Sequence, residues 1–242
     1  MPNALQLVLF DLDDTLFDHQ YSRRCGLLVL QHAYSPLARI PIEDLVAEHE
    51  RQLTASYDGV LDGTVSLLAN RLERFRRMFV NCGVAMNAAE VELAMQRYRR
   101  AYEEHRRAVS GVISLLTYLK PRLRIGVVTN GLVAVQQEKI VACKLEGFID
   151  FLLTSEEAKV KKPDPRLFLL ALEKAKAQRE DAVVVGDSWT LDVLGAHQAG
   201  IRSIWLNRSQ EPCLDTSLAT ELEAFEPLEH ALKAFYTERG TV

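Results

Sequence analysis

The apolar run from Leu7 to Phe10 has no polar face. A short run of this kind is typical of a strand that is covered on both faces of a parallel sheet. It ends at a cluster of acids, in which Asp11 and Asp13 are two residues apart. Residues i and i+2 of an extended chain point the same way, so we expect both carboxylates to converge just beyond the strand.

The pattern changes from strand to helix between about residues 18 and 109. Apolar positions recur there at helical spacing, and strand signals are absent. Pro41 is a typical first residue of a helix, and Asn87 with Glu90 resembles a capping box. The sequence therefore predicts a compact helical bundle, with helices at 22–33, from Pro41 onward, at 66–82 and from 87 to about 109.

Strands and helices alternate in the rest of the chain. We expect strands at 124–129, 151–154, 182–186 and 203–206, with helices at 111–120, 133–142, 166–175 and 191–199. This alternation predicts an α/β fold, a Rossmann-like parallel sheet with helices on both faces. The amphipathic tail from Glu221 is expected to cover an edge of the sheet. The predicted domains are an α/β core of residues 1–17 and 110–242 and an inserted α-helical bundle cap of residues 18–109.

Polar residues recur where the predicted strands end. The carboxyl ends of parallel strands meet at one edge of the sheet, so residues far apart in sequence should converge there. Three acids within four residues repel one another unless a cation lies among them, and oxygen ligands suit Mg²⁺. The residues expected to converge are Asp11, Asp13, Thr129, Lys162, Asp187 and Asp192.

Each of these residue types has a role in phosphoryl transfer. A carboxylate can attack phosphorus, and a second carboxylate can protonate the leaving alcohol and then activate water. Mg²⁺ neutralises the developing charge, while Lys162 and the Thr129 hydroxyl would hold phosphate oxygens. The predicted edge of the sheet is therefore a plausible site for a divalent metal and a phosphoryl group.

Four segments resemble, in the same order, the four motifs of the haloacid dehalogenase-like (HAD) phosphatases. The resemblance spans about residues 4–207, and the helical insert resembles the α-helical cap of that superfamily's first subfamily. The matching segments are Asp11-Leu-Asp13-Asp14-Thr15, Thr129-Asn130-Gly131, Lys162-Pro163-Asp164-Pro165 and Gly186-Asp187-Ser188-Trp189-Thr190-Leu191-Asp192.

The resemblance implies a role for each acid. Asp11 matches the nucleophile, and Asp13 matches the general acid/base. Asp187 matches a direct Mg²⁺ ligand. Asp11 and the backbone carbonyl of Asp13 are the other implied ligands, and Asp192 matches a second acid near the metal.

The resemblance also implies a phosphate-binding group and a cap that reads the leaving group. Two residues in the predicted bundle, Tyr21 and Arg74, are candidates for substrate specificity. The residues expected to bind phosphate are Thr129, Asn130, Gly131 and Lys162.

Composition narrows the classes of function. The net charge of −4 offers no electrostatic case for binding nucleic acid or an anionic membrane surface. The four cysteines are scattered, which favours reduced thiols and a cytoplasmic location. The N-terminal run lacks a basic region and breaks at Asp11, which is unlike a signal peptide, and no run approaches the roughly 18 apolar residues of a membrane span. Monomer and homodimer both fit the sequence.

The function these observations favour is a Mg²⁺-dependent phosphatase acting on a small phosphorylated metabolite, of the sugar phosphate, phosphoglycolate or nucleoside monophosphate type. A 2-haloacid dehalogenase is one alternative, although those relatives lack an acid at the position of Asp13. A phosphomutase would use the same site. A phospho-receiver signalling domain also combines acids, a threonine and a lysine, but receivers are about half as long and have no helical insert.

Overall fold

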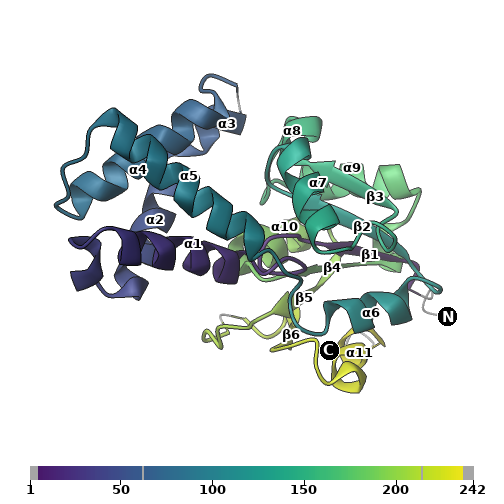
Figure 1. Ribbon diagram of the computed structural model, residues 1–242. Helices are drawn as coiled ribbons and strands as arrows, with labels where there is room; N and C mark the ends of the chain where they lie inside the picture. Colours follow the sequence, from purple (N-terminus) through teal and green to yellow (C-terminus); the bar gives the residue numbers. More distant parts are fainter. Residues whose placement is uncertain (1–4, 62, 214, 237–242) are drawn as a thin grey trace. The chain divides into compact units, whose positions relative to one another are not determined.

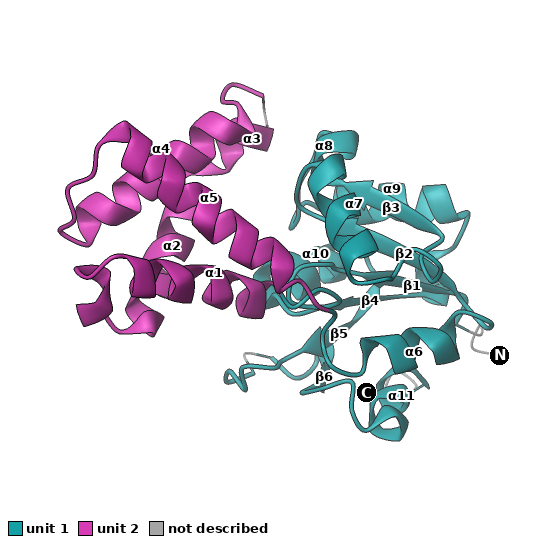
Figure 2. Ribbon diagram, in the orientation of Figure 1, with its two compact units in different colours: residues 1–18, 108–242 teal, residues 19–107 magenta. Residues whose placement is uncertain are grey.

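The computed structural model of this 242-residue chain describes residues 5–61, 63–213 and 215–236. The chain divides into two compact units (Figure 2). The first unit consists of residues 1–18 and 108–242, and the second of residues 19–107.

The first unit is built on a parallel sheet with the strand order β3-β2-β1-β4-β5-β6 (Figure 1). The predicted Rossmann-like α/β fold is confirmed. Its apolar strands carry few polar side chains, as expected when both faces are covered. The strands are β1 (Leu7–Phe10), β2 (Arg124–Thr129), β3 (Phe151–Thr154), β4 (Ala182–Gly186), β5 (Arg202–Leu206) and β6 (Ala219–Leu222).

Helices lie on both faces of this sheet. On one face, α9 (Pro165–Ala175) and α10 (Leu194–Gln198) pack against side chains such as Leu9 and Val184. On the other face, the Phe10 ring lies 6.4 Å from that of Phe235 on α11. The remaining helices of this unit are α6 (Val112–Leu119), which contacts α11 (Leu228–Tyr236), α7 (Val133–Ala142) and α8 (Ser155–Ala158).

The C-terminal part of the sheet differs from the prediction. Glu221, the predicted start of an amphipathic tail over the edge of the sheet, lies in β6, which pairs with β5 and itself forms that edge. The four residues of β6 lack an apolar run, so its pairing depends on the register with β5 rather than on a local signal. The predicted helix at 191–199 begins as a π-helical turn, Trp189–Val193, before α10.

The second unit is a bundle of helices around an apolar core that includes Leu27, Phe75 and Met95. A capping box of Asn87 and Glu90 begins its last helix, as the sequence predicts. None of the described helices in either unit is long and apolar enough to cross a membrane. The helices are α1 (His19–Ala33), α2 (Ile42–Ser56), α3 (Asp58–Leu61), α4 (Leu67–Asn81) and α5 (Ala88–Glu104).

The helix expected to reach Val109 ends at Glu104. The chain beyond it becomes extended, and Ala108 forms an antiparallel bridge with Phe17. The backbone N–H of Val109 donates a hydrogen bond to the carbonyl of Leu16, at 2.9 Å. The two crossings of the chain into and out of the helical unit are therefore paired side by side, just beyond the loop that follows β1.

Candidate active site

Strands β1 and β4 are neighbours at the point where the strand order reverses. Open α/β sheets bind ligands beyond the carboxyl ends of the strands at such a point. Asp11 follows β1, and its backbone N–H donates a 2.8 Å hydrogen bond to the carbonyl of Val185 on β4. Asp187 follows β4 directly. The sheet therefore brings two acids together that are far apart in the sequence.

Lys162 connects two carboxylates in the interior of this site. Its ammonium Nζ lies 2.5 Å from Asp11 Oδ1 and 2.6 Å from Asp192 Oδ1. All three side chains are buried. The two carboxylates hold the pKa of Lys162 above its ordinary value, although burial acts in the opposite direction. Lys162 is therefore a permanent positive charge beside Asp11.

Glycine is required where β4 ends. A Cβ atom at Gly186 would lie 2.2 Å from Cγ of Asp192, so a larger residue would displace that carboxylate. The other oxygen of Asp192 accepts a 3.1 Å hydrogen bond from the backbone N–H of Ser188. Both oxygens of Asp192 are thus engaged, one by Lys162 and one by the turn, which fits a supporting acid better than a direct metal ligand.

Asp187 is less constrained than Asp192. Its backbone N–H donates to the Thr15 hydroxyl at 3.0 Å, and that hydroxyl reaches Asp187 Oδ1 at 3.5 Å. Burial, together with repulsion from Asp11 and Asp192, raises the pKa of Asp187 to about 9. Burial also raises the pKa of Asp11, to about 7, because Lys162 offsets only part of the cost.

These donors fit a hard divalent cation. Asp11, Asp187 and Asp192 each offer a carboxylate oxygen, and the three oxygens lie within 4.8 Å of one another. The raised pKa values of Asp11 and Asp187 indicate that too little positive charge surrounds their carboxylates, and oxygen ligands are what Mg²⁺ prefers. The carboxylate of Asp13 is not part of this group, which leaves its backbone carbonyl as the ligand that the resemblance implies.

The Asp13 carboxylate has partners of its own. Lys139 Nζ lies 2.7 Å from both of its oxygens, and Gln136 Nε2 donates to Oδ2 at 3.2 Å. Both partners lie on α7 and are buried, whereas Asp13 is partly exposed. Asp11 and Asp13 thus come from one loop but are paired with different lysines.

The residues expected to bind phosphate lie in adjoining loops. The buried hydroxyl of Thr129 accepts a 2.7 Å hydrogen bond from Gln136 Nε2, which leaves its own proton available for an acceptor. The side chain of Asn130 donates to the carbonyl of Lys162 at 3.1 Å and accepts from its N–H at 2.8 Å. Asn130 therefore ties the loop after β2 to the backbone that carries Lys162. The N–H of Gly131 donates to the Ser155 hydroxyl at 2.9 Å.

The two candidate specificity residues lie in the helical unit. The Tyr21 ring on α1 is stacked against Arg107, whose guanidinium carbon lies 3.3 Å from the ring centroid. Arg74 lies on α4 and is buried, with 8% of its surface exposed.

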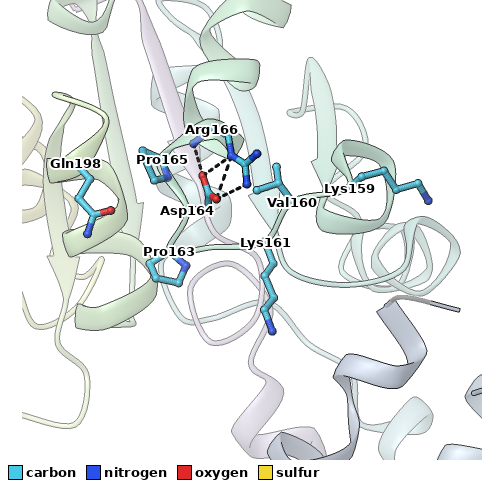
Figure 3. Close-up of a pocket in the computed structure, with 8 residues that line it drawn as sticks. All are labelled: Lys159, Val160, Lys161, Pro163, Asp164, Pro165, Arg166 and Gln198. Carbon is cyan, nitrogen blue, oxygen red and sulfur yellow. Dashed lines mark hydrogen bonds and ion pairs between the residues drawn. The ribbon is translucent and has the colours of Figure 1, made fainter. Parts of the chain in front are cut away.

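A cavity of about 570 Å³ lies beside the loop that carries Lys162 (Figure 3). One side is formed by the start of α9, where Asp164 caps the helix and pairs with Arg166 at 2.7 Å. None of the residues brought together at Asp11 lines this cavity, so it is distinct from the candidate active site. Its lining residues are Lys159, Val160, Lys161, Pro163, Asp164, Pro165, Arg166 and Gln198.

Comparison with known proteins shows the family of the chain. A family model described as haloacid dehalogenase-like hydrolase matches residues 5–200. The chain belongs to this family. The resemblance seen in the four motifs is thereby confirmed, and the chain is a HAD-like hydrolase rather than a receiver domain.

Several HAD proteins are similar over almost the whole chain. A solved structure of YfnB from Bacillus subtilis, bound to magnesium, is 25% identical; the match covers 96% of this chain and 100% of that one, with a TM-score of 0.74. The pyrimidine 5'-nucleotidase YjjG of Escherichia coli is 30% identical over 83% of this chain and 85% of its own length. A solved 2-haloacid dehalogenase from Pseudomonas syringae is 27% identical over 94% and 98% of the two chains, with a TM-score of 0.62.

Sequence reasoning missed three contacts of this HAD site, those made by Gln136, Lys139 and Ser155. Gln136 and Lys139 are three residues apart on α7, so they lie on one face of the helix. Two long polar side chains beside the apolar Ile140 on a core-facing helix were the available signal. The sequence does not reveal their partner, Asp13, because it lies more than a hundred residues away.

Proposed function

We propose that this protein is a Mg²⁺-dependent phosphatase that hydrolyses a small phosphomonoester through a phosphorylated Asp11. The observation that carries the proposal is the division of labour between two neighbouring acids. Asp11 is buried against Lys162, whereas Asp13 is partly exposed and held by Lys139. One carboxylate is thus positioned among groups that stabilise negative charge, and the other keeps access to a leaving group and to water.

In the first step, a carboxylate oxygen of Asp11 attacks phosphorus and forms an aspartyl phosphate. The bond between phosphorus and the ester oxygen breaks, and the proton of Asp13 goes to that oxygen, so the alcohol leaves neutral. In the second step, Asp13 takes a proton from water as the water oxygen attacks phosphorus. The bond to Asp11 breaks, which releases inorganic phosphate and restores both acids.

The other residues bind and orient the phosphoryl group. Lys162 supplies a fixed positive charge beside the attacking oxygen, and the Thr129 hydroxyl donates its free proton to a phosphate oxygen. When bound by Asp11, Asp187 and the Asp13 carbonyl, with Asp192 nearby, Mg²⁺ would supply the charge that balances the acids and the phosphate. Asn130 positions Lys162. The N–H of Gly131, which donates to the Ser155 hydroxyl, fixes the loop beside Thr129.

The names of the similar proteins support a class of substrate for this chain. YjjG is named for action on pyrimidine nucleotides, and the YfnB structure contains magnesium. We extend to this chain a small phosphorylated substrate from the first and a divalent metal from the second. We further propose that residues 18–109 act as a cap domain inserted into a core of residues 1–17 and 110–242, and that this cap selects the leaving group.

A substrate panel tests the proposal. Purified protein should release phosphate from p-nitrophenyl phosphate and from at least one of a set of sugar phosphates, phosphoglycolate and nucleoside monophosphates. Asp11→Asn should abolish this activity, because the amide replaces the nucleophile at nearly constant shape. The matched control is Asp44→Asn, which changes an exposed acid on α2 and should retain full activity.

Two further measurements separate the alternatives. Asp13→Asn should slow the second step, so acid-quenched protein should carry one added phosphoryl group, which mass spectrometry would assign to Asp11. A 2-haloacid dehalogenase would instead release halide from 2-chloropropionate and leave phosphomonoesters intact. That outcome, or phosphate release by Asp11→Asn at the wild-type rate, would reject the proposed phosphatase.

A further inference from the structure

A cluster of polar side chains lies inside the helical unit, beside its apolar core. Arg23 of α1, His49 of α2, Arg74 of α4 and Tyr98 of α5 are all buried. The imidazole of His49 is flanked by aromatic rings, with centroid distances of 5.0 Å to Tyr98 and 5.7 Å to Phe75. We call Arg23, His49, Arg74 and Tyr98 the Arg74 cluster.

Polar atoms of this cluster lack partners. Neither ring nitrogen of His49 has a hydrogen-bond partner among the described residues, and neither does Nε of Arg74 or of Arg23. Buried polar atoms of folded proteins are nearly always hydrogen-bonded, because leaving them unpaired is costly. Four unpaired atoms from three helices therefore indicate that a polar ligand belongs among them.

The charge of the cluster identifies the kind of ligand. Arg23 is already paired with Glu50. No carboxylate of the described residues lies within ion-pair distance of Arg74. Burial, together with Arg74, Arg23 and His19, holds the pKa of His49 well below its usual range, so the imidazole is neutral near pH 7. Water could satisfy the unpaired nitrogens, but it would leave the charge of Arg74 uncompensated.

We propose that the Arg74 cluster is a binding site for a carboxylate group. A guanidinium pairs with a planar carboxylate through two parallel hydrogen bonds, and a neutral imidazole N–H can donate another. One uncompensated positive charge matches a carboxylate monoanion better than a phosphate dianion. The aromatic rings of Phe75 and Tyr98 lie beside His49, and an apolar border of this kind strengthens an ion pair because it lowers the local dielectric.

The carboxylate can come from two sources. If the proposed phosphatase function holds, one source is the alcohol part of the substrate, which would make phosphorylated hydroxy acids the preferred class. The other source is a free carboxylate that binds the helical unit independently of catalysis. Both require the same site, and a binding arm and a turnover arm of one experiment distinguish them.

The binding arm uses the full-length wild-type protein with ¹⁵N-labelled histidine. The chain has only six histidines, so the His49 ring signals can be assigned by their loss in His49→Gln. We expect D-glycerate to shift these signals saturably at pH 7.5, and the neutral analogue glycerol to leave them unchanged. Absence of a saturable shift with D-glycerate would overturn the proposal.

Variants of α4 test the role of Arg74 in that shift. Arg74→Met should weaken D-glycerate binding at least tenfold, and Arg74→Lys should retain part of it because the charge remains. The matched control is Arg77→Met, since Arg77 is exposed on the same helix and paired with Glu73 at 2.7 Å. An affinity that is the same in Arg74→Met as in wild type would refute a site centred on Arg74.

The turnover arm compares 3-phosphoglycerate with glycerol 3-phosphate, which differ in the carboxylate. If the substrate supplies the carboxylate, wild type should prefer 3-phosphoglycerate in kcat/KM, and Arg74→Met should lose at least tenfold of that preference. A His49 shift without such a preference assigns the site to a free carboxylate and still supports the proposal. Failure to hydrolyse p-nitrophenyl phosphate would reject the phosphatase function alone, because the binding arm remains decisive for the carboxylate site.

Discussion

The ammonium group of Lys139 lies 2.7 Å from both carboxylate oxygens of Asp13. This symmetrical contact restrains the rotation of the carboxylate. Gln136, one turn earlier on α7, contacts the same carboxylate at 3.2 Å. Together they direct Asp13 away from the three acids that converge beside Asp11. We interpret Lys139 as a positioning residue for the proposed general acid/base.

Replacing Lys139 should therefore slow turnover more than it weakens binding. We expect Lys139→Met to lower kcat by roughly 10²-fold, in line with the contribution of one well-placed general acid, with a small change in KM. Steady-state kinetics on p-nitrophenyl phosphate would measure both. Lys174→Met is the control, because Lys174 is an exposed lysine whose pair with Glu157 lies on the surface. Equal losses in kcat for the two variants would contradict the positioning role.

Replacing Asp187 by asparagine should change the thermal stability of the protein in opposite directions with and without metal. Asp187 has a pKa raised to about 9, above its ordinary value of 3.8, chiefly by burial. Its ionisation therefore opposes folding, and metal-free stability should fall as the pH rises from about 4 to 9. Without metal, Asp187→Asn should melt at a higher temperature than wild type at pH 8, because wild type must take up a proton at Asp187 to fold and the amide need not.

Magnesium should reverse that order. A ligand present at a hundred times its Kd stabilises the folded state by about 2.7 kcal/mol. We expect Mg²⁺ to raise the melting temperature of wild type and to leave Asp187→Asn nearly unchanged, with EDTA restoring the metal-free order. Thermal unfolding at pH 8 gives all four values. A full Mg²⁺ shift in Asp187→Asn would exclude this carboxylate as a ligand.

The sequence predicts best what depends on short local patterns. Strands at 124–129, 151–154 and 182–186 have the predicted bounds, because each is an apolar run with clear ends. The convergence of Asp11, Lys162 and Asp187 follows from one rule, that parallel strands end at the same edge. Their detailed roles in catalysis remain predictions that the variants above address.

What the sequence misses depends on partners that are distant along the chain. Lys139 and Arg74 both lie on amphipathic helices, where long basic side chains usually reach solvent. Only the packed structure shows that Lys139 meets Asp13 and that Arg74 is buried. The edge strand β6 was missed for a related reason, since its pairing with β5 replaces a local apolar signal.

The buried imidazole of His49 should make the protein less stable in mild acid. Burial, Arg74, Arg23 and His19 all depress its pKa, and the rings of Phe75 and Tyr98 enclose it. Below about pH 6.5, His49 binds a proton in the unfolded chain but stays neutral in the folded chain. The stability that is present above that pH is therefore lost as the pH falls.

Denaturant unfolding between pH 8 and pH 5 would test whether the free energy of unfolding falls as the pH falls. One such proton changes the free energy of unfolding by up to about 1.4 kcal/mol per pH unit. His49→Phe keeps an aromatic ring between the neighbouring rings and should lose less stability than wild type over this range. His230→Phe replaces an exposed histidine on α11 and serves as the control. Parallel pH profiles for wild type and His49→Phe would contradict a neutral buried imidazole.

The buried guanidinium of Arg74 should lower the stability of the ligand-free protein. It lies on α4, and among the described residues its Nε has no hydrogen-bond partner and no acid pairs with it. Leaving a buried polar group unsatisfied costs about 1 to 3 kcal/mol, and methionine has a similar length and helix propensity. Arg74→Met should therefore raise the free energy of unfolding by about that amount, whereas Arg77→Met should change it by less than about 1 kcal/mol, as is typical of a surface pair.

D-glycerate should stabilise wild type but not Arg74→Met. If Arg74→Met unfolds more easily than wild type, the guanidinium already has a favourable environment within the bundle and needs no carboxylate ligand.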